Sequence, residues 1–380
     1  MIIAPERASY GGLGRTIGVL GFRRIKNRSA LNHAAFRVAR RRRSRTYQPM
    51  GYIGLPVLKT GWATGPVPPQ GGQCMPGGLR ARRQERDSPQ PGCRQYACLM
   101  SSEATIRILH RDDELQLGEF TCPPADRRWR DENDIGEGFH VVFPWTPVQI
   151  SRRAMPSLVA TPNHAVLYSP RLRFHRRYLT NEGDHCLFAV LSPSLCTRLG
   201  LGGGGSLVDP VLSPSLWLAQ RVLAEYLRRP DHDPEAAGHL GRRLVESALA
   251  SVPYCSGSPA GQAVEQTKEL MALSPGRLLP LDLVARQAHY SRFHLLRSFH
   301  ARTGYTLHQY HLQLRLRRSV DMVLAGVPLA DIAHHLGFQG HSHFTARFRR
   351  SFGWTPSGLR TIVASQGDVP DVVSALLPAA

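Results

Sequence analysis

Residues 331–360 of this 380-residue chain, DIAHHLGFQGHSHFTARFRRSFGWTPSGLR, decide the fold of its C-terminal part. They repeat a pattern that occurs first in residues 283–323, LVARQAHYSRFHLLRSFHARTGYTLHQYHLQLRLRRSVDMV. In both copies an alanine is followed, ten or eleven positions later, by an apolar residue, then by a phenylalanine four positions on and a glycine five positions after that. The shared positions are Ala285, Leu295, Phe299 and Gly304 in the first copy and Ala333, Phe344, Phe348 and Gly353 in the second. Matched spacing predicts that one local structure occurs twice.

Each copy has the pattern of a helix, a tight turn and a second helix. Alanine before the turn lets two helices cross closely, and Ser291 can cap the second helix of the first copy. Apolar residues four positions apart share one helix face and pack into a core. The opposite face is left to basic residues, namely Arg292, Arg297, Arg347, Arg349 and Arg350. A DNA-binding helix-turn-helix needs one face that packs and one that enters the major groove. The alternative is a plain helical bundle with solvated arginines, which two matched copies disfavour.

The segment between the two copies predicts one continuous helix over Thr306–Leu324. Leu312, Leu316 and Val320 occur at helical spacing, and Gly326 can end the helix. A helix of this length spans about 28 Å. Such a spacer could place two recognition helices in successive major grooves, which lie about 34 Å apart on one face of the duplex.

The charge of the chain favours a polyanionic partner, with nucleic acid first. Lys and Arg number 48 against 28 for Asp and Glu, a formal net charge of +20. The distribution is uneven, with +15 on residues 1–100, −1 on 101–262, +8 on 263–363 and −2 on 364–380. The informative charge is the +8, because it coincides with the repeated motif. The sequence lacks the apolar run of about 18 residues that a membrane-spanning helix needs, so no membrane partner is expected.

Residues 1–100 predict a disordered basic extension. They contain Gly/Pro clusters such as GPVPPQGGQ at 65–73 and the run Arg40–Arg43, without helical periodicity or strand alternation. One interpretation is a basic arm that adds phosphate contacts. The other is an extension that results from a wrongly assigned upstream start codon. We favour the second, because SSEATIRILH directly after Met100 looks like the start of a domain.

Residues 101–200 predict a small β-barrel or jelly roll. Short β-rich runs alternate with turn residues such as Pro123-Pro124 and Pro162-Asn163. The predicted strands are Thr105–His110, Leu115–Thr121, Gly138–Trp145, Val148–Arg152, Ala165–Ser169, Phe174–Leu179 and His185–Leu191. The interior of such a barrel could hold a small effector.

We expect no metal and no cofactor. His140, His164, His175 and His185 could supply metal ligands, but their spacing fits no ligand motif, so ordinary surface or core histidines are expected. The seven cysteines are odd in number, scattered and without a C-x-x-C pair. Reduced cytosolic thiols are therefore the expectation, and a zinc site or disulfide framework is disfavoured.

Residues 207–255 predict a helical linker after a glycine-rich hinge at 202–205. One helix starts at Ser213-Pro214 and runs to Arg229, and a second covers Pro234–Ala250. These helices are candidates for a dimer contact, and they are equally good candidates for covering the open face of the barrel. Residues 364–380 are assigned only as a tail.

The two quoted stretches resemble the double helix-turn-helix of AraC/XylS-type transcriptional regulators, over residues 263–363. The middle of the chain is similar, less sharply, to the cupin-like regulatory half of many members, and residues 1–100 match nothing in the family. The resemblance implies a multidomain protein, with a cupin-like β-barrel regulatory domain at 101–200 and an all-α double helix-turn-helix DNA-binding domain at 263–363. The family signature IAxxxGFxxxSxFxxxFxxxxGxxP is matched by Ile332, Ala333, Gly337, Phe338, Ser342, Phe344, Phe348, Gly353 and Pro356.

The resemblance also implies which residues contact DNA. Arg297 is the best candidate for base recognition, because arginine can bind guanine O6 and N7 bidentately. In the first recognition helix the base contacts would come from Phe293, Leu296 and Arg297, with Ser291, Arg292 and His294 nearer the DNA backbone. In the second they would come from His341, Ser342 and Thr345, with Gln339, Arg347 and Arg349 as further DNA-binding residues.

One departure from the family pattern concerns the second recognition helix. Members commonly have arginine where this chain has Ala346, and a small residue where it has Arg347. The second helix would then read DNA weakly, or Arg347 would reach a phosphate instead. His341 and His343 could be interpreted as a metal pair, but on a recognition helix we expect them to be polar residues that face the groove.

The leading hypothesis is a sequence-specific DNA-binding transcriptional regulator, cytoplasmic and associated with the nucleoid. Its partners would be operator or promoter DNA, a small effector, RNA polymerase and a second copy in a homodimer. One alternative is a cupin-type metalloenzyme fused to a DNA-anchoring helix-turn-helix, which would need converging ligands or an acid/base pair. Another is a DNA repair factor with a reactive cysteine, but residues 263–363 contain no cysteine.

Overall fold

The computed structural model describes residues 103–153, 155–202, 207–250, 259–277, 279–365 and 369–378, which all belong to one unit of the chain, 84–380. The predicted basic extension, residues 1–100, lies outside the described residues. The strands are β1 (Thr105–Arg111), β2 (Leu115–Cys122), β3 (Asn133–Asp134), β4 (Phe139–Pro144), β5 (Val148–Arg152), β6 (Met155–Ala160), β7 (Val166–Tyr168), β8 (Arg173–Tyr178), β9 (Asp184–Leu191) and β10 (Leu207–Val208). The helices are the 3-10 helix η2 (Arg127–Trp129), α1 (Pro193–Arg198), α2 (Pro214–Leu227), α3 (Pro234–Leu249), α4 (Pro259–Leu273), α5 (Leu281–Gln287), α6 (Arg292–Thr303), α7 (Leu307–Leu324), α8 (Leu329–His335), α9 (His341–Phe352), α10 (Pro356–Ala364) and α11 (Val369–Leu376).

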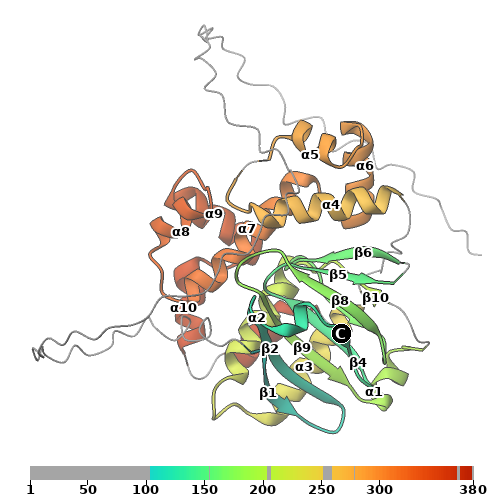
Figure 1. Cartoon of the computed structure of the whole chain (residues 1–380). Helices are drawn as coiled ribbons and strands as arrows, with labels where there is room; N and C mark the ends of the chain where they lie inside the picture. Colours follow the sequence, from blue (N-terminus) through green and yellow to red (C-terminus); the bar gives the residue numbers. More distant parts are fainter. Residues whose placement is uncertain are drawn as a thin grey trace, which may run out of the picture. The chain divides into compact units, whose positions relative to one another are not determined.

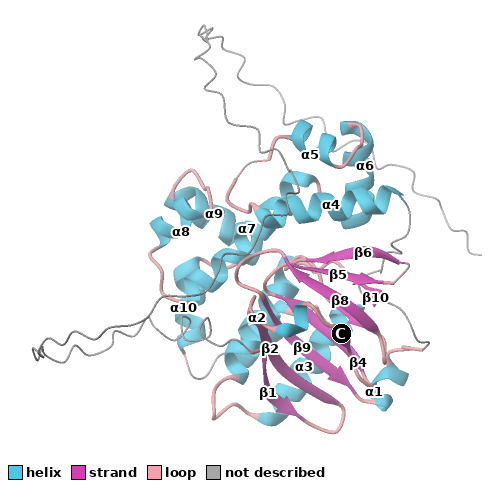
Figure 2. Ribbon diagram, in the orientation of Figure 1, coloured by secondary structure: helices cyan, strands magenta, loops and turns pink. Residues whose placement is uncertain are grey.

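The strands form two antiparallel sheets, and Figure 2 draws the strands of both in magenta. The larger sheet has six strands in the order β1-β2-β9-β4-β7-β10, and the smaller has four in the order β3-β8-β5-β6. The strands divide between two sheets instead of closing into one barrel. The predicted fold class, a multidomain chain with a β-sheet domain followed by an all-α double helix-turn-helix domain, is confirmed (Figure 1).

Alternation along the strands gives the six-stranded sheet two different faces. In β9, Leu187 and Ala189 lie in the core shared with α2 and α3, whereas Cys186 and Phe188 line a cavity on the other face. Successive side chains of a strand point to opposite sides, so this pattern follows directly from the sequence. A second core, which includes Ile150 and residues of the four-stranded sheet, fills the space beyond the cavity.

Helices α2 and α3 cover the outer face of the six-stranded sheet. Helix α2 is buried along most of its length, and the side chain of Trp217 is 1% exposed. The centroid of its indole ring lies 6.1 Å from the ring centroid of Phe352 in α9. The sheet, α2, α3, α11 and the helices around α9 therefore share one hydrophobic core. Both helices thus cover the sheet on its outer face, opposite the cavity, and not at the open face of a barrel; a dimer contact stays a prediction.

The predicted elements agree closely with the structure. All seven predicted strands and the helices α2, α3 and α7 are present, with ends that differ by one or two residues. Strands β3, β6 and β10 were missed because two are only two residues long and β6 carries a proline at its second position. Residues 364–380, which the sequence analysis assigned only as a tail, contain α11, packed against α2 and α3. Among the described helices, none is both long and apolar enough to span a membrane.

A buried cluster of four charged side chains joins the first helix-turn-helix to the sheets. The cluster consists of Asp209, Glu265, Lys268 and Arg302, each with a side chain no more than 6% exposed. Lys268 Nζ lies 2.9 Å from Glu265 Oε2 and 3.1 Å from Asp209 Oδ2, and Arg302 Nη2 lies 2.9 Å from Asp209 Oδ1. Burial lowers the pKa of Lys268, but the carboxylates of Glu265 and Asp209 outweigh this effect and raise it above its ordinary value. The formal charges of the four groups balance.

The cluster also reaches the backbone of the four-stranded sheet. Glu265 Oε2 accepts a hydrogen bond of 2.7 Å from the backbone N–H of Val159 in β6. Nearby, the fully buried Arg317 of α7 donates to the carbonyl oxygens of Pro162 and, at 2.7 Å, Leu212. Buried charges are tolerated only when they are paired and hydrogen-bonded, so these contacts hold α4, α6 and α7 in defined positions.

Replacement of Arg302 by leucine should strongly destabilise the protein. The substitution leaves two buried carboxylates for one lysine, and loss of one partner of a buried ion pair costs about 3–5 kcal/mol. Urea denaturation followed by circular dichroism measures the change. Arg297→Leu is the matched control, because this residue lies on the same helix and is exposed. Equal unfolding midpoints for both variants would show that the cluster contributes nothing to stability.

Candidate nucleic-acid interface

The first helix-turn-helix consists of α5, a short turn and α6. Leu295 and Phe299 of α6 are fully buried and pack against Val284 and Ala285 of α5, as the spacing predicted. The Ser291 hydroxyl accepts a hydrogen bond from the backbone N–H of His294, which caps α6. This half of the DNA-binding part has a core of its own, separate from the one around α2.

The outer face of α6 exposes a large apolar ring next to basic side chains. Phe293 is 70% exposed, and the guanidinium carbon of Arg297 lies 4.6 Å from the centroid of its ring. Leu296 and His294 are also exposed. Arg292 Nε lies 2.9 Å from Asp282 Oδ1 of α5, in an exposed ion pair. The ring of Phe293 makes a cation–π contact with the Arg297 guanidinium, which orients the cation at the surface.

The second helix-turn-helix consists of α8, its turn and α9. Phe344, Phe348 and Phe352 are buried, and Ile332 and Ala333 of α8 pack against them. The start of α9 has no side-chain cap, because Gly340 stands where the first copy has Ser291. The two copies therefore differ at the N-terminus of the recognition helix, where a helix first meets the DNA.

The outer face of α9 is less uniform than that of α6. His341, Ser342 and Arg349 are exposed, as is Gln339 in the preceding turn. Thr345 is only partly exposed. Arg347 is half-buried, and its Nε donates a hydrogen bond of 3.2 Å to His343 Nε2, so part of its donor capacity is used within the helix.

The structure thus places the predicted DNA-binding residues on two outer faces, one for each recognition helix. Ser291 caps α6 and keeps its own O–H for a further partner. Arg302, Arg315 and Arg317 belong to the basic C-terminal segment but are buried, so a considerable part of its +8 charge does not face outward. Nothing in the local sequence distinguishes these arginines from exposed ones, because their partners lie far away in the chain.

The cavity between the two sheets, here termed the inter-sheet cavity, has a volume of about 350 Å³. Its walls are mainly apolar and aromatic, and its charged lining residues are Arg128, Asp134, Arg176 and Asp184. The lining includes Phe120, Ile135, His140, Val142, Tyr168, Phe174, Arg176, Asp184, Cys186 and Phe188. The sequence analysis did not single out Arg176. Strand alternation gave a signal, since Arg176 shares the inward face of β8 with the buried Phe174.

Arg176 is held by several groups but keeps one unused donor. Its side chain is 7% exposed, its Nη1 lies 2.5 Å from Asp184 Oδ2, and its Nη2 donates to Asn133 Oδ1 at 3.3 Å. Burial lowers the pKa of Arg176, but the Asp184 carboxylate outweighs this effect and raises it. Arg176 Nε is buried and has no hydrogen-bond partner among the described residues. A buried donor without a partner is costly, and a ligand in the cavity could satisfy it.

The four histidines considered as metal ligands have other partners or face solvent. Burial lowers the pKa of His140, whose Nδ1 lies 3.1 Å from the carbonyl oxygen of Gly138. Burial and neighbouring positive charges lower the pKa of His164 far below its usual range, and that of His185 to about 3. His175 is exposed. Across the described part of the chain, no group of three or more His, Cys, Asp or Glu side chains is placed to hold a metal ion.

Comparison with known proteins gives the same answer for the C-terminal part. A family model described as "Helix-turn-helix domain" matches residues 284–362. The regulatory protein SoxS of Salmonella typhimurium is 39% identical over 83 residues, which are 22% of this chain and 78% of SoxS. The transcriptional activator RhaS of Escherichia coli O157:H7 is 36% identical over 80 residues, 21% of this chain and 29% of RhaS.

Solved structures with similarity include two from other bacteria. The fatty-acid-bound ToxT of Vibrio cholerae is 13% identical with a TM-score of 0.26, covering 65% of this chain and 95% of ToxT. An AraC-type regulator from Chromobacterium violaceum is 27% identical with a TM-score of 0.26, covering 28% of this chain and 95% of that one. The identity with most of SoxS, together with the doubled helix-turn-helix, shows that the chain belongs to the AraC/XylS family of DNA-binding transcriptional regulators.

Proposed function

We propose that this regulator reads its operator mainly through α6. The exposed Phe293 with the Arg297 guanidinium above its ring carries this proposal. Stacking restricts the guanidinium before DNA arrives, which lowers the entropic cost of a bidentate contact to guanine. Leu296 would contact a thymine methyl group, while Ser291, Arg292 and His294 would bind the phosphate backbone near the start of the helix.

We propose a weaker, more electrostatic role for α9. Ala346 stands at the position that Arg297 occupies in α6, so α9 has no arginine there to read guanine. His341, Ser342 and Thr345 would contact base edges, whereas Gln339, Arg347 and Arg349 would contact phosphates. Phosphate contacts position a protein on the duplex and carry little sequence information.

The regulatory domain, residues 101–200, would sense an effector in the inter-sheet cavity. Arg176 and Asp184 form an ion pair, so the buried end of the cavity has no net formal charge to attract an ion. An anionic ligand would meet the Asp184 carboxylate, and a cation would meet Arg176. The proposed effector is therefore a neutral, largely apolar and aromatic molecule with one acceptor oxygen for Arg176 Nε.

Further partners follow from the family and from one exposed strand. Residues 263–363 would bind DNA and contact RNA polymerase, and residues 207–255 would link the two domains. DNA binding implies a cytoplasmic, nucleoid-associated protein.

For a homodimer we propose pairing through β1, an edge strand. Ile106 and Ile108 of this strand are 63% and 43% exposed. Apolar side chains on an unpaired edge strand favour pairing with a second copy. No observation favours the metalloenzyme alternative.

Replacement of Arg297 by alanine should weaken operator binding and relax specificity at one base pair. Loss of a bidentate guanine contact costs about 1–3 kcal/mol on the specific site and little on random DNA. Fluorescence anisotropy with an operator selected from a random library measures both affinities. If Arg297→Ala binds the operator and random DNA as the parent does, Arg297 does not read a base.

Replacement of Arg349 by alanine is the matched comparison on α9. A lost phosphate contact should weaken binding to operator and random DNA by similar factors and reduce the salt dependence of log K by about 1. The same anisotropy titrations at several salt concentrations measure this. A loss confined to the operator would instead assign Arg349 a base contact.

Replacement of Val142 by tryptophan should fill the inter-sheet cavity and block the binding of neutral aromatic molecules. The probe is N-phenyl-1-naphthylamine, a neutral fluorophore, and we expect its affinity to fall about tenfold or more. Arg107→Trp is the control, because it adds an indole to an exposed position of β1. Equal probe binding by both variants, with unfolding midpoints like that of the parent, would exclude this cavity as the effector site.

A further inference from the structure

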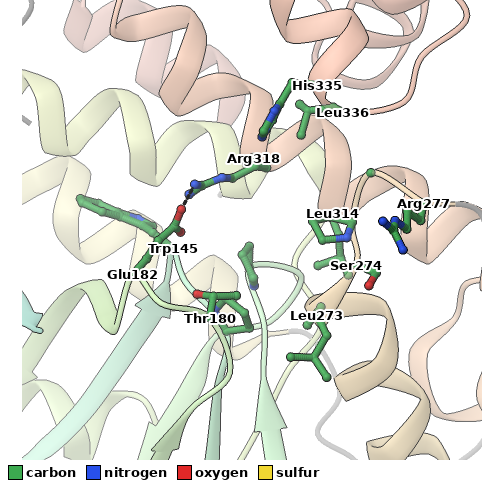
Figure 3. A pocket seen from close by; sticks show the side chains of 15 residues that line it. Trp145, Thr180, Glu182, Leu273, Ser274, Arg277, Leu314, Arg318, His335 and Leu336 are labelled. Carbon is green, nitrogen blue, oxygen red and sulfur yellow. Dashed lines mark hydrogen bonds and ion pairs between the residues drawn. The ribbon is translucent and has the colours of Figure 1, made fainter. Parts of the chain in front are cut away.

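A second cavity lies where loops of the sheets meet the end of α4, α7 and α8. This junction cavity, with a volume of about 540 Å³, is shown in Figure 3. Its lining comes from strand-connecting loops, from the end of α4 and the segment after it, and from α7 and α8. It shares no lining residue with the inter-sheet cavity. A ligand here would contact loops of the sheets, the segment between α4 and α5, α7, and α8 of the second helix-turn-helix.

One wall of the junction cavity is apolar. Leu273, at the end of α4, is 48% exposed, although leucine side chains are normally buried when a core is available. Leu314 of α7 and Trp145, which follows β4, add buried apolar surface to the same lining. The exposed part of Leu273 is apolar surface that an occupant of the cavity could cover.

Two arginines also line the cavity, at separate places. Arg318 of α7 forms an ion pair with Glu182 of the β8–β9 loop, and both side chains are partly exposed, 36% and 40% (Figure 3). Arg277 is exposed and has no ion pair among the described residues. The lining therefore carries two guanidinium groups, on Arg277 and Arg318, and one carboxylate, on Glu182. A solvent-accessible ion pair contributes little to stability, so a ligand can replace Glu182 at Arg318 at low cost.

A hydrogen-bond donor without a partner completes the site. Thr180 Oγ1 is buried, lines the cavity and has no hydrogen-bond partner within the described chain. A hydroxyl at this position can donate to a ligand oxygen and thereby satisfy a buried polar group.

We propose that the junction cavity binds a small organic anion that has an apolar ring. Its carboxylate replaces Glu182 as the partner of Arg318, and Thr180 donates a hydrogen bond to it. The charge of Arg277, elsewhere in the lining, adds to the attraction for an anion. The ring packs against Leu273 and Leu314. This ligand differs in charge from the neutral effector of the inter-sheet cavity. Because it contacts the segment that leads from α4 to α5 and also α8, it fixes the position of the first helix-turn-helix relative to the second. This regulatory consequence rests on the proposed function.

Isothermal titration calorimetry with the full chain tests the site, with biphenyl-4-carboxylate and its neutral amide as probes. The carboxylate should bind with one-to-one stoichiometry, and the amide about tenfold more weakly or not at all, because it lacks the charge that pairs with Arg318. Equal binding of the two probes, or binding of neither at millimolar concentration, overturns the proposal.

Two variants of the same ion pair give a sharper test. Arg318→Met removes the group that binds the anion and should weaken carboxylate binding about tenfold, whereas Glu182→Gln removes its competitor and should strengthen binding by about threefold. A purely structural role for the pair predicts that both variants act in the same direction, and that result contradicts the proposal. Arg153→Met, at an exposed arginine outside both cavities, should leave carboxylate binding unchanged.

Two further measurements separate this site from the proposed effector site and from DNA binding. Val142→Trp should retain carboxylate binding. If it loses that binding, the anion occupies the inter-sheet cavity and the junction site is wrong. Saturating carboxylate should change operator affinity in the parent but not in Arg318→Met. An unchanged operator affinity in the parent overturns the regulatory consequence, while Arg297→Ala tests the DNA interface independently.

Discussion

Charge neutralisation inside the protein determines where the first recognition helix stands. Lys268 and Arg302 leave solvent only because Asp209 and Glu265 meet them, and Asp209 comes from the segment next to β10 rather than from the DNA-binding helices. Unpaired, any of these groups would be expensive to bury. The pairing is geometrically specific, unlike apolar packing, so α4 and α6 cannot slide along the sheet. A regulator that must present two helices in a fixed register to DNA gains positional accuracy from such a contact.

The two helix-turn-helix units are copies in sequence but differ in how they are attached. The first, together with α4, has its own small core and meets the sheets through the buried charge cluster and a small apolar cluster of Val159, Leu179 and Ala272, whereas the second merges with the core around Trp217. Polar contacts depend on orientation and can be exchanged with water or ligand groups, while a shared apolar core separates only at a high cost. The position of the first unit thus depends on paired charges, and that of the second on apolar packing. The first unit also carries Arg297, on the outer face of α6 next to the exposed Phe293.

Local sequence features predicted those parts of the structure that depend on residues close together in the chain. Spacing of alanine, phenylalanine and glycine predicted both units, and Ser291 caps α6 as expected because capping involves only residues three positions apart. The roles of Arg302 and Arg317 were not predictable in this way. Their partners, Asp209 and Leu212, lie 93 and 105 positions away, and nothing near these arginines shows that they are buried. Arg176 is an intermediate case. Alternation along β8 predicts that its side chain points inward, but it does not show that Nε is without a hydrogen-bond partner among the described residues.

Helix α2 packs against the sheet and also against α9, through Trp217 and Phe352. This double use limits how the protein can evolve by exchange of domains. A second helix-turn-helix transplanted without α2 and α11 would bring a bare aromatic surface into water. A foreign sensor domain would have to supply a matching indole at the right depth. The β-sheets and the second helix-turn-helix of this chain are therefore joined through one core, and changes in α2 are expected to be accompanied by changes in α9.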